Sequence, residues 1–312
     1  MPTVRGSPHF RVERLGPGVY AAMAAEKGYG LCNSGIVDLG GRTVVFDSML
    51  TPMAGTDLAR AAEKLTGRRP DWVVNSHWHG DHLWGNSAFS SAHVVSSRRV
   101  REVVLRKSQR QFDRCRREFP NELARLDDAD SNVPPIDRPT LRGWFQGVIK
   151  TPTPLRIVPP DVTFEEELRL EGSRRSLRLV THGGGHSPSD VYAYLEDERV
   201  AFCGDLVDVD QHPSVGDGWP RRWIRILDRI EELRIEHAVP GHGPIGGADA
   251  VGSTKTYLRD LERTVADGIR KGLSARSVRR LGIPERYRDW RYSIAYPENL
   301  ARAYQLAQRH LE

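Results

Sequence analysis

Four side chains of types that commonly bind metals are crowded into one short segment of this chain. Within six residues it carries His77, His79, Asp81 and His82. The segment directly follows residues 71–74, Asp-Trp-Val-Val, which predict a buried strand ending in a loop. Because side chains alternate along an extended segment, the first three ligands would point to one side and His82 elsewhere. One strand end could therefore serve two neighbouring metal ions.

Three further candidate ligands follow, each beside a strand-like apolar run. His186 lies in a glycine-rich segment after such a run. Asp205 follows the apolar residues 200–203, and His242 follows residues 238–240 in the sequence Pro-Gly-His-Gly-Pro. Strand ends are where a fold can bend side chains from distant segments towards a common point. Four such segments in this order are much stronger evidence than any one of them.

Taken together, the four segments resemble the metallo-β-lactamase-fold superfamily. Its hallmark is an HxHxDH motif after a strand, and its downstream motifs are similar to the Gly-Gly-His-Ser-Pro, Cys-Gly-Asp and Pro-Gly-His-Gly sequences found here. The resemblance covers roughly residues 30–247. It implies an α/β protein, an αβ/βα four-layer sandwich with metals at the common edge of its two sheets. Periodicity alone predicts only a mixture of α and β structure.

The resemblance also implies a set of metal ligands. It assigns seven residues to two ions: His77, His79 and His186 to the first, Asp81, His82 and His242 to the second, and Asp205 to both as a bridge. Imidazole and carboxylate ligands without thiolate suit zinc, although iron or manganese would accept the same set. A relative that had lost metal binding would lack some of these ligands, and none is missing here. We therefore expect two zinc ions per chain as cofactors.

Two metal ions a few ångströms apart favour hydrolysis, because a water that bridges two cations is deprotonated near neutral pH. In this hypothesis the bridging hydroxide attacks a small ester, lactone, thioester or amide, β-lactams included. The expected catalytic residues are Asp205, as the bridge, and Asp81. The proton carrier is either Asp81 or a second metal-bound water. The sequence holds no Gly-x-Ser-x-Gly elbow for a serine nucleophile.

Two other functions stay open at this level. A mononuclear iron oxygenase of the persulfide-dioxygenase kind resembles the same ligand order but uses only the site of His77, His79 and Asp205, or its neighbours. A phosphodiesterase or nuclease is suggested by residues 98–119, which carry nine positive and three negative side chains. We favour a solvated helix face for this basic segment. A small molecule, and not nucleic acid, is therefore the expected partner.

Several residues near the ligands are candidates for supporting or substrate-contacting roles. Asp47 resembles a family aspartate that supports the metal loop without binding metal. His182 could orient a ligand or touch substrate, and His212 could face the cleft. Trp78 flanks the ligands and is expected to pack or to line the cleft wall. Trp144 lies in an insert where this family builds cleft-covering elements, so it is the expected aromatic contact of a lid.

One sizeable domain is predicted, since 38% of the 312 residues are hydrophobic. Residues 1–250 would form the metallo-β-lactamase-like domain, with an insert or lid at about 98–160. Residues 251–312 would form a C-terminal extension of helices packed on the same domain. A helix is predicted for residues 98–119, whereas residues 121–160 are expected to be irregular because they are rich in proline.

Local signals also predict a helix over residues 52–66, with Thr51 as its N-cap and Gly67 after its end. No apolar run approaches the roughly 20 residues that span a bilayer. The first residues lack the apolar core of a secretory signal. Three cysteines without a Cys-x-x-Cys pair indicate neither disulfides nor a thiolate zinc site. We therefore expect a cytoplasmic protein without membrane association, with a homo-oligomer left open.

Overall fold

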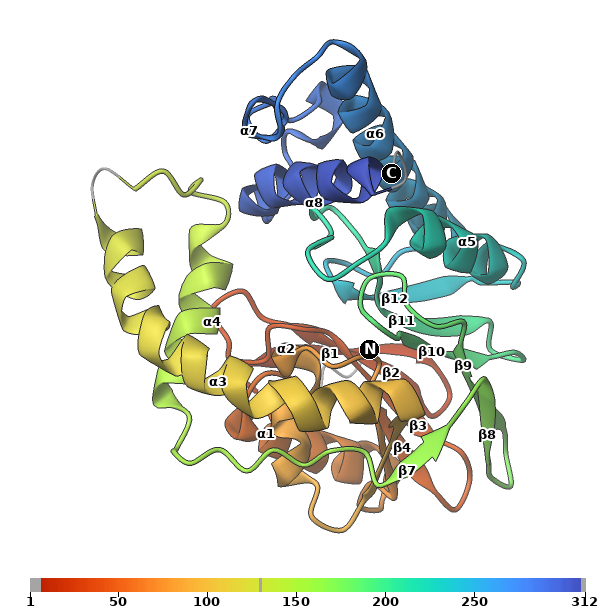
Figure 1. Cartoon of the computed structure of the whole chain (residues 1–312). Helices are drawn as coiled ribbons and strands as arrows, with labels where there is room; N and C mark the ends of the chain where they lie inside the picture. The colour runs from red at the N-terminus through yellow and green to blue at the C-terminus, as the bar shows by residue number, and fades with distance from the viewer. Residues whose placement is uncertain (1–6, 129–130, 310–312) are drawn as a thin grey trace.

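A seven-stranded sheet forms the first half of the chain in the computed structural model, which describes residues 7–128 and 131–309 (Figure 1). Its strands are adjacent in chain order: β1 (Phe10–Gly16), β2 (Val19–Ala24), β3 (Ser34–Asp38), β4 (Thr43–Phe46), β5 (Trp72–Val74), β6 (His93–Ser97) and β7 (Val162–Phe164). The pairs from β1 to β4 are antiparallel, and those from β4 to β7 are parallel. Parallel neighbours need crossover connections, so helices follow β4, β5 and β6.

A five-stranded sheet forms most of the second half. Its order is β12-β11-β10-β9-β8, and its strands are β8 (Glu167–Glu171), β9 (Ser176–Thr181), β10 (Val191–Leu195), β11 (Val200–Asp208) and β12 (His237–His242). Helix α5 (Pro220–Glu231) connects the parallel strands β11 and β12. After β12 come α6 (Ala248–Arg270), α7 (Ala275–Val278), the short turns η2 (Glu285–Tyr287) and η3 (Ser293–Ala295), and α8 (Tyr296–Gln308).

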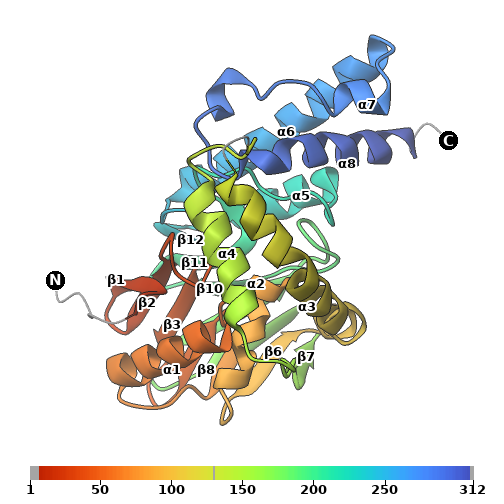
Figure 2. The same ribbon diagram turned by 90° about the vertical axis from the view of Figure 1, so that its left-hand side faces the viewer.

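The two sheets pack face to face, and helices cover the outer face of each. Between the sheets, Phe46 of β4 stacks on Phe202 of β11 with ring centroids 5.8 Å apart. Gly35 makes room for this contact, because a Cβ there would lie 2.5 Å from the Phe202 ring. One helical layer packs on the second sheet through α5, α6 and α8, and the other lies on the first sheet (Figures 1 and 2). The predicted αβ/βα four-layer sandwich is confirmed, and C-terminal helices are present.

The first helical layer consists of α1 (Pro52–Thr66), the short α2 (Gly80–Leu83) with η1 (Trp84–Ala88), and the pair α3 (Arg98–Asp127) and α4 (Arg138–Lys150). The predicted bounds of α1 are confirmed. Thr51 Oγ1 accepts the N–H of Ala54 at 3.1 Å, and Gly67 ends the helix with φ of 76°. Local capping residues thus mark both ends of this helix.

The expectation that residues 121–160 are irregular was wrong for much of that stretch. Helix α3 continues through Pro120 to Asp127, and α4 follows. The two helices pack on each other, with Phe119 and Phe145 ring centroids 4.6 Å apart. Burial of such apolar faces offsets the backbone hydrogen bond that a proline removes. The pair lies side by side over the first sheet, as Figure 2 shows.

The basic side of α3 faces solvent. Its buried face includes Val100, Val104, Cys115 and Phe119. Within residues 7–128 and 131–309, no helix is both long enough and apolar enough to cross a membrane. Residues 1–6 and 310–312, which the predicted domain ranges and the signal-peptide argument included, lie outside the described part of the chain.

A buried carboxylate ties the insert to the C-terminal segment. Asp137, directly before α4, is 2% exposed. It accepts the backbone N–H of Tyr292 at 2.5 Å, the N–H of Ser293 at 3.1 Å and the Ser293 hydroxyl at 2.9 Å. Tyr292 has φ of 56°, a left-handed conformation that side chains other than glycine rarely adopt. The three hydrogen bonds therefore hold Tyr292 in a conformation that it would not keep alone.

We expect Asp137→Ala to loosen this junction. The substitution leaves buried donors without an acceptor, which costs about 1–3 kcal/mol. Hydrogen exchange measured by mass spectrometry should show faster exchange around Tyr292 while β11 stays protected. Asp289→Ala, which removes an exposed carboxylate from the same segment, is the control. It should change neither the exchange around Tyr292 nor the protection of β11. Unchanged exchange at Tyr292 in the Asp137 variant would show that Asp137 does not hold the C-terminal segment in place.

Candidate metal centre

The seven candidate ligands are carried by segments that end at the same edge of the two sheets. The loop after β5 and helix α2 present His77, His79, Asp81 and His82, the loop between β9 and β10 presents His186, and strands β11 and β12 present Asp205 and His242. The structure brings them together as two groups: His77, His79, His186 and Asp205, and Asp81, His82 and His242. In each group the possible ligand atoms lie within 4.8 Å of one another.

The carboxylate of Asp205 lies between these groups. Its Oδ2 is 3.7 Å from His77 Nε2 and 3.4 Å from His186 Nε2. Its Oδ1 is 3.0 Å from His82 Nε2 and 3.5 Å from His242 Nε2. One oxygen thus faces each group, which is the arrangement that a bridging ligand requires.

Three of the ring nitrogens that point away from the centre have partners of their own. His82 Nδ1 lies 2.7 Å from Asp47 Oδ2, and His242 Nδ1 donates to the Leu31 carbonyl at 3.2 Å. His79 Nε2 lies 3.5 Å from an oxygen of Asp217. Such contacts fix the tautomer and the orientation of a ring, so the other nitrogen presents its lone pair to the centre.

Asp47 anchors the loop after β5, which carries His77 and His79. It is fully buried, and besides His82 it accepts the Ser76 N–H at 2.7 Å and the Ser76 hydroxyl at 2.8 Å. Its own φ of 59° turns the chain sharply at the end of β4. Asp47 therefore lies where the sequence analysis placed it, under the loop and outside the two ligand groups.

Electrostatics prepare the centre for cations. Burial lowers the pKa of His186 to about 3, so that ring is neutral and one of its nitrogens has a free lone pair. Burial alone would raise the pKa of Asp205, but the imidazoles of His82 and His242 outweigh it and hold that pKa well below its usual value. Burial alone would lower the pKa of His242, but Asp205 and Asp81 outweigh burial and raise that pKa well above its usual value. Protons thus occupy positions that a metal ion would take over.

The donor set fits a metal. Among the buried side chains that the structure describes, His77 Nε2, His82 Nε2 and Asp205 Oδ1 have no hydrogen-bond partner. A buried polar atom without a partner is costly, and these three face the same small volume. Metal ligation would satisfy all of them. Neutral imidazole and carboxylate are the ligand types of zinc, and iron and manganese also use them.

The loop that carries His186 is held by a residue that sequence reasoning missed. Asp190 is buried, and its carboxylate accepts the N–H of Gly185 at 2.7 Å and the N–H of Ser187 at 3.1 Å. Burial raises the pKa of Asp190 to about 6. Aspartate often closes tight turns through such bonds, so the Ser-Pro-Ser-Asp sequence after His186 was the available signal. For Asp217, which contacts His79 from a distant loop, no comparable signal exists.

Two histidines proposed for the cleft lie elsewhere. His212 is fully buried, and its nitrogens contact the Tyr257 hydroxyl and the Tyr287 carbonyl, each at 3.1 Å. It packs among the aromatic rings of the outer helical layer, so the expectation that it faces the cleft was wrong. His182 is exposed, 3.4 Å from the Tyr192 hydroxyl, and does not line the cavity beside the ligands.

The two candidate tryptophans have different positions. Trp78 is 6% exposed and packs in the apolar cluster under α3, with the Lys107 ammonium 4.7 Å from its ring centroid. It is a packing residue. Trp144 lines a cavity of about 220 Å³, which is also lined by His79, Asp205 and other candidate ligands. The predicted aromatic residue of the insert thus lies beside the candidate metal centre.

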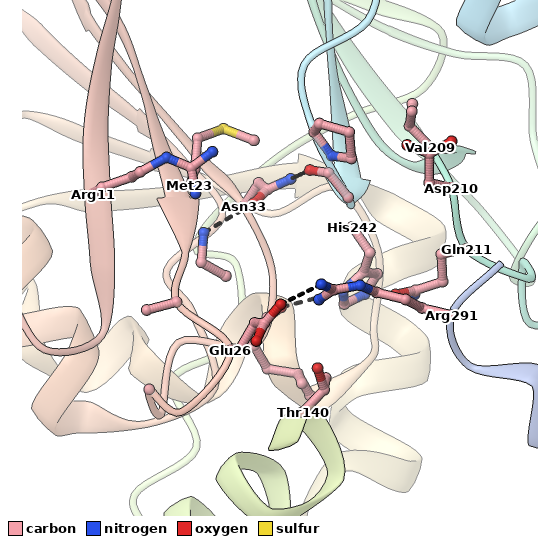
Figure 3. Close-up of a pocket in the computed structure, with 16 residues that line it drawn as sticks. Arg11, Met23, Glu26, Asn33, Thr140, Val209, Asp210, Gln211, His242 and Arg291 are labelled. Carbon is pink, nitrogen blue, oxygen red and sulfur yellow. Dashed lines mark hydrogen bonds and ion pairs between the residues drawn. The ribbon is translucent and has the colours of Figure 1, made fainter. Parts of the chain in front are cut away.

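A second cavity, of about 340 Å³, lies on the other side of His242. It shares His242, Leu31, Thr140 and Gln211 with the first cavity, so the two are neighbours along one groove. Figure 3 shows an ion pair between Glu26 and Arg291 that crosses this second cavity. The C-terminal segment thus contributes side chains to both.

The model of the metallo-beta-lactamase superfamily matches residues 28–242, well over half of the chain. The chain therefore belongs to the metallo-beta-lactamase superfamily. The match begins in the loop before β3 and ends at His242, so it spans every candidate ligand.

Two curated proteins are similar over parts of their length. The metallo-beta-lactamase type 2 of Bacteroides fragilis is 28% identical over 104 residues, 32% of this chain and 42% of that protein. The linear primary-alkylsulfatase of Pseudomonas sp. (strain ATCC 19151) is 23% identical over 223 residues, 65% of this chain and 40% of that protein. The chain thus matches less than half of the length of each.

Two solved structures share the fold. A metallo-beta-lactamase from Pontibacter korlensis superposes with a TM-score of 0.60 at 18% identity, covering 80% of this chain and 99% of that one. The DIM-1 metallo-beta-lactamase superposes with a TM-score of 0.56 at 17% identity, covering 81% and 98%. At these identities the comparison establishes the sandwich and leaves the reaction open.

Gly241 provides a test of the centre that leaves every ligand in place. A Cβ at this position would lie 1.9 Å from Asp205 Oδ1, so Gly241→Ala must displace that carboxylate. We expect a loss of metal affinity of at least about 10-fold, the effect of disturbing the support of a ligand. Gly216→Ala is the control, because no atom lies within 4 Å of a Cβ there. Metal content by mass spectrometry after dialysis gives the comparison, and equal content in both variants would contradict the site.

Proposed function

We propose that this chain is a metal-dependent hydrolase of a small ester, lactone, thioester or amide, with zinc as its metal. The observation that carries the proposal is the position of Asp205, one oxygen towards each ligand group. Membership of the superfamily and the two groups of convergent ligands support it.

In this proposal His77, His79 and His186 hold one ion, Asp81, His82 and His242 hold the other, and Asp205 contacts both. When bound, two divalent cations would lower the pKa of a bound water and polarise the carbonyl group of the substrate, whose carbon is then attacked more easily. The imidazole and carboxylate ligands of both groups are of the types found in catalytic zinc sites, and they support the proposal of zinc.

The chain's own groups supply positioning and proton transfer. Asp81 lines the cavity with its carboxylate, and its Oδ2 lies 3.2 Å from His242 Nε2. From there it can take a proton from the attacking water and return it to the leaving group. Asp47 and Asp217 keep His82 and His79 in fixed orientations, so little reorganisation is needed during the reaction.

Asp205→Ala removes the group shared by the two ligand sets and should lower turnover by at least about 100-fold, with the fold retained. Circular dichroism and metal analysis should accompany the kinetics. Asp38→Ala is the matched control, since Asp38 is also a buried carboxylate but pairs with Arg68 and Arg174 at the other end of β3. Full activity of the Asp205 variant would reject the assignment.

The reaction class is decided by metal analysis of the purified protein joined to a panel of lactam, lactone, ester, thioester, amide and phosphodiester substrates. Two zinc equivalents with hydrolysis of an acyl substrate are expected. One iron equivalent with thiol-dependent oxygen consumption would instead establish the oxygenase, and salt-sensitive cleavage of a phosphodiester would establish the nuclease.

A further inference from the structure

The cavity beside the candidate metal centre has one apolar wall. It is lined by Leu31, Leu141, Trp144 and Tyr292, which also pack on a single hydrophobic cluster centred on α3 and α4. The four residues come from the loop before β3, from α4 and from the C-terminal segment. Three separate parts of the chain thus combine to make one continuous apolar surface next to the ligands.

The two aromatic residues of this wall are held in place before any ligand arrives. The ring of Phe119 meets Trp144 edge to face, with centroids 5.2 Å apart. Tyr292 is fixed through its backbone by the hydrogen bonds to Asp137 described above. A preorganised surface loses little conformational entropy when a ligand binds, so contact with it contributes more to affinity.

The remaining lining is uncharged or negative. Gln111, Thr140, Gln211 and Ser214 offer neutral hydrogen-bonding groups. The acidic residues of the lining are Asp81, Asp205 and Asp208, and the carboxylates of Asp81 and Asp205 offset positive charge that bound metal ions would bring.

Cations in the neighbouring cavity are matched by acids. Arg291 pairs with Glu26, as Figure 3 shows, and Arg11 pairs with Glu13 at 2.9 Å. An anionic end of a substrate would compete with these two glutamates for the arginines. The charge distribution of the groove therefore favours a neutral molecule.

We propose that this cleft selects an uncharged acyl substrate whose non-reacting end is a flat apolar group, bound against Trp144, Leu141 and Tyr292. The inference rests on the proposed hydrolase function and adds the substrate class. Trp144 and Tyr292 are specificity-determining residues in this scheme, and Asp137 is a positioning residue that acts through Tyr292. Aromatic rings suit this role, because they bury large apolar area in a defined orientation.

Two substrates that differ only at the acyl end test the charge preference. Methyl phenylacetate and monomethyl succinate, or their thioester counterparts, share the leaving group and carry a flat neutral end or a carboxylate. With the zinc-loaded protein, and after correction for the rate of each compound with hydroxide, kcat/KM should favour the phenylacetyl compound by about 10-fold or more. Equal values, or preference for the succinyl compound, would overturn the proposal.

Variants of the wall test where the apolar end binds. Trp144→Ala and Tyr292→Ala should each lower kcat/KM for the phenylacetyl compound about 10-fold, chiefly through KM, whereas Tyr292→Phe should stay within about twofold. Trp72→Ala is the matched control, because Trp72 is also half-buried but lies on β5 beside His93, outside the cavity. Unchanged KM in both alanine variants would reject the wall as the binding surface.

A binding measurement separates this inference from the proposed function. N-benzylacetamide, a neutral amide with a flat end, is titrated calorimetrically into the zinc-loaded wild type, Trp144→Ala and Trp72→Ala. If the wild type hydrolyses no acyl compound but binds this probe, and only the Trp144 variant binds it about 10-fold more weakly, the hydrolase proposal fails and the binding wall stands. If hydrolysis is found but the probe binds all three proteins equally, the wall fails and the hydrolase stands.

Discussion

The candidate metal centre depends on one buried carboxylate, which lies between imidazoles carried by segments of both sheets. Asp205 projects from β11 with an oxygen towards each group of imidazoles, and the backbone of Gly241 on β12 passes so close that no side chain fits between them. Asn33 joins the other sheet to this edge by donating to the carbonyls of Pro240 and Gly243 at 3.0 and 2.9 Å. The sandwich therefore brings the ligands together by aligning strand ends, with short loops completing the set.

Around this carboxylate, other buried aspartates hold the loops that carry the ligands. Asp47 holds both Ser76 and His82, so the ligand loop and its ring are positioned by the same buried group. Asp190 does the same for the loop of His186 through backbone donors. Groups that would be costly to bury alone become tolerable because each has a partner or faces the place of a cation. These contacts orient the ligand side chains before any substrate enters.

The apolar side of the cleft follows a different principle. It comes from elements outside the strand ends, namely α4 and the segment around Tyr292, which meet at Asp137. Local signals misled here, because the prolines of residues 121–160 suggested an irregular insert, whereas Phe119 and Phe145 stabilise a packed helical pair. The energy that keeps α3 helical lies in contacts with residues far along the chain, which no local pattern contains.

The sequence by itself determined the elements whose signals are local: the bounds of α1, set by Thr51 and Gly67, and the motifs that mark the ends of the ligand-bearing strands. Resemblance supplied the sandwich and the grouping of the ligands. Only the tertiary structure decided that His212 belongs to an aromatic core, that Asp217 supports His79, and which wall faces the centre. These depend on distances between segments far apart in the chain, and spacing along a sequence carries no such distances.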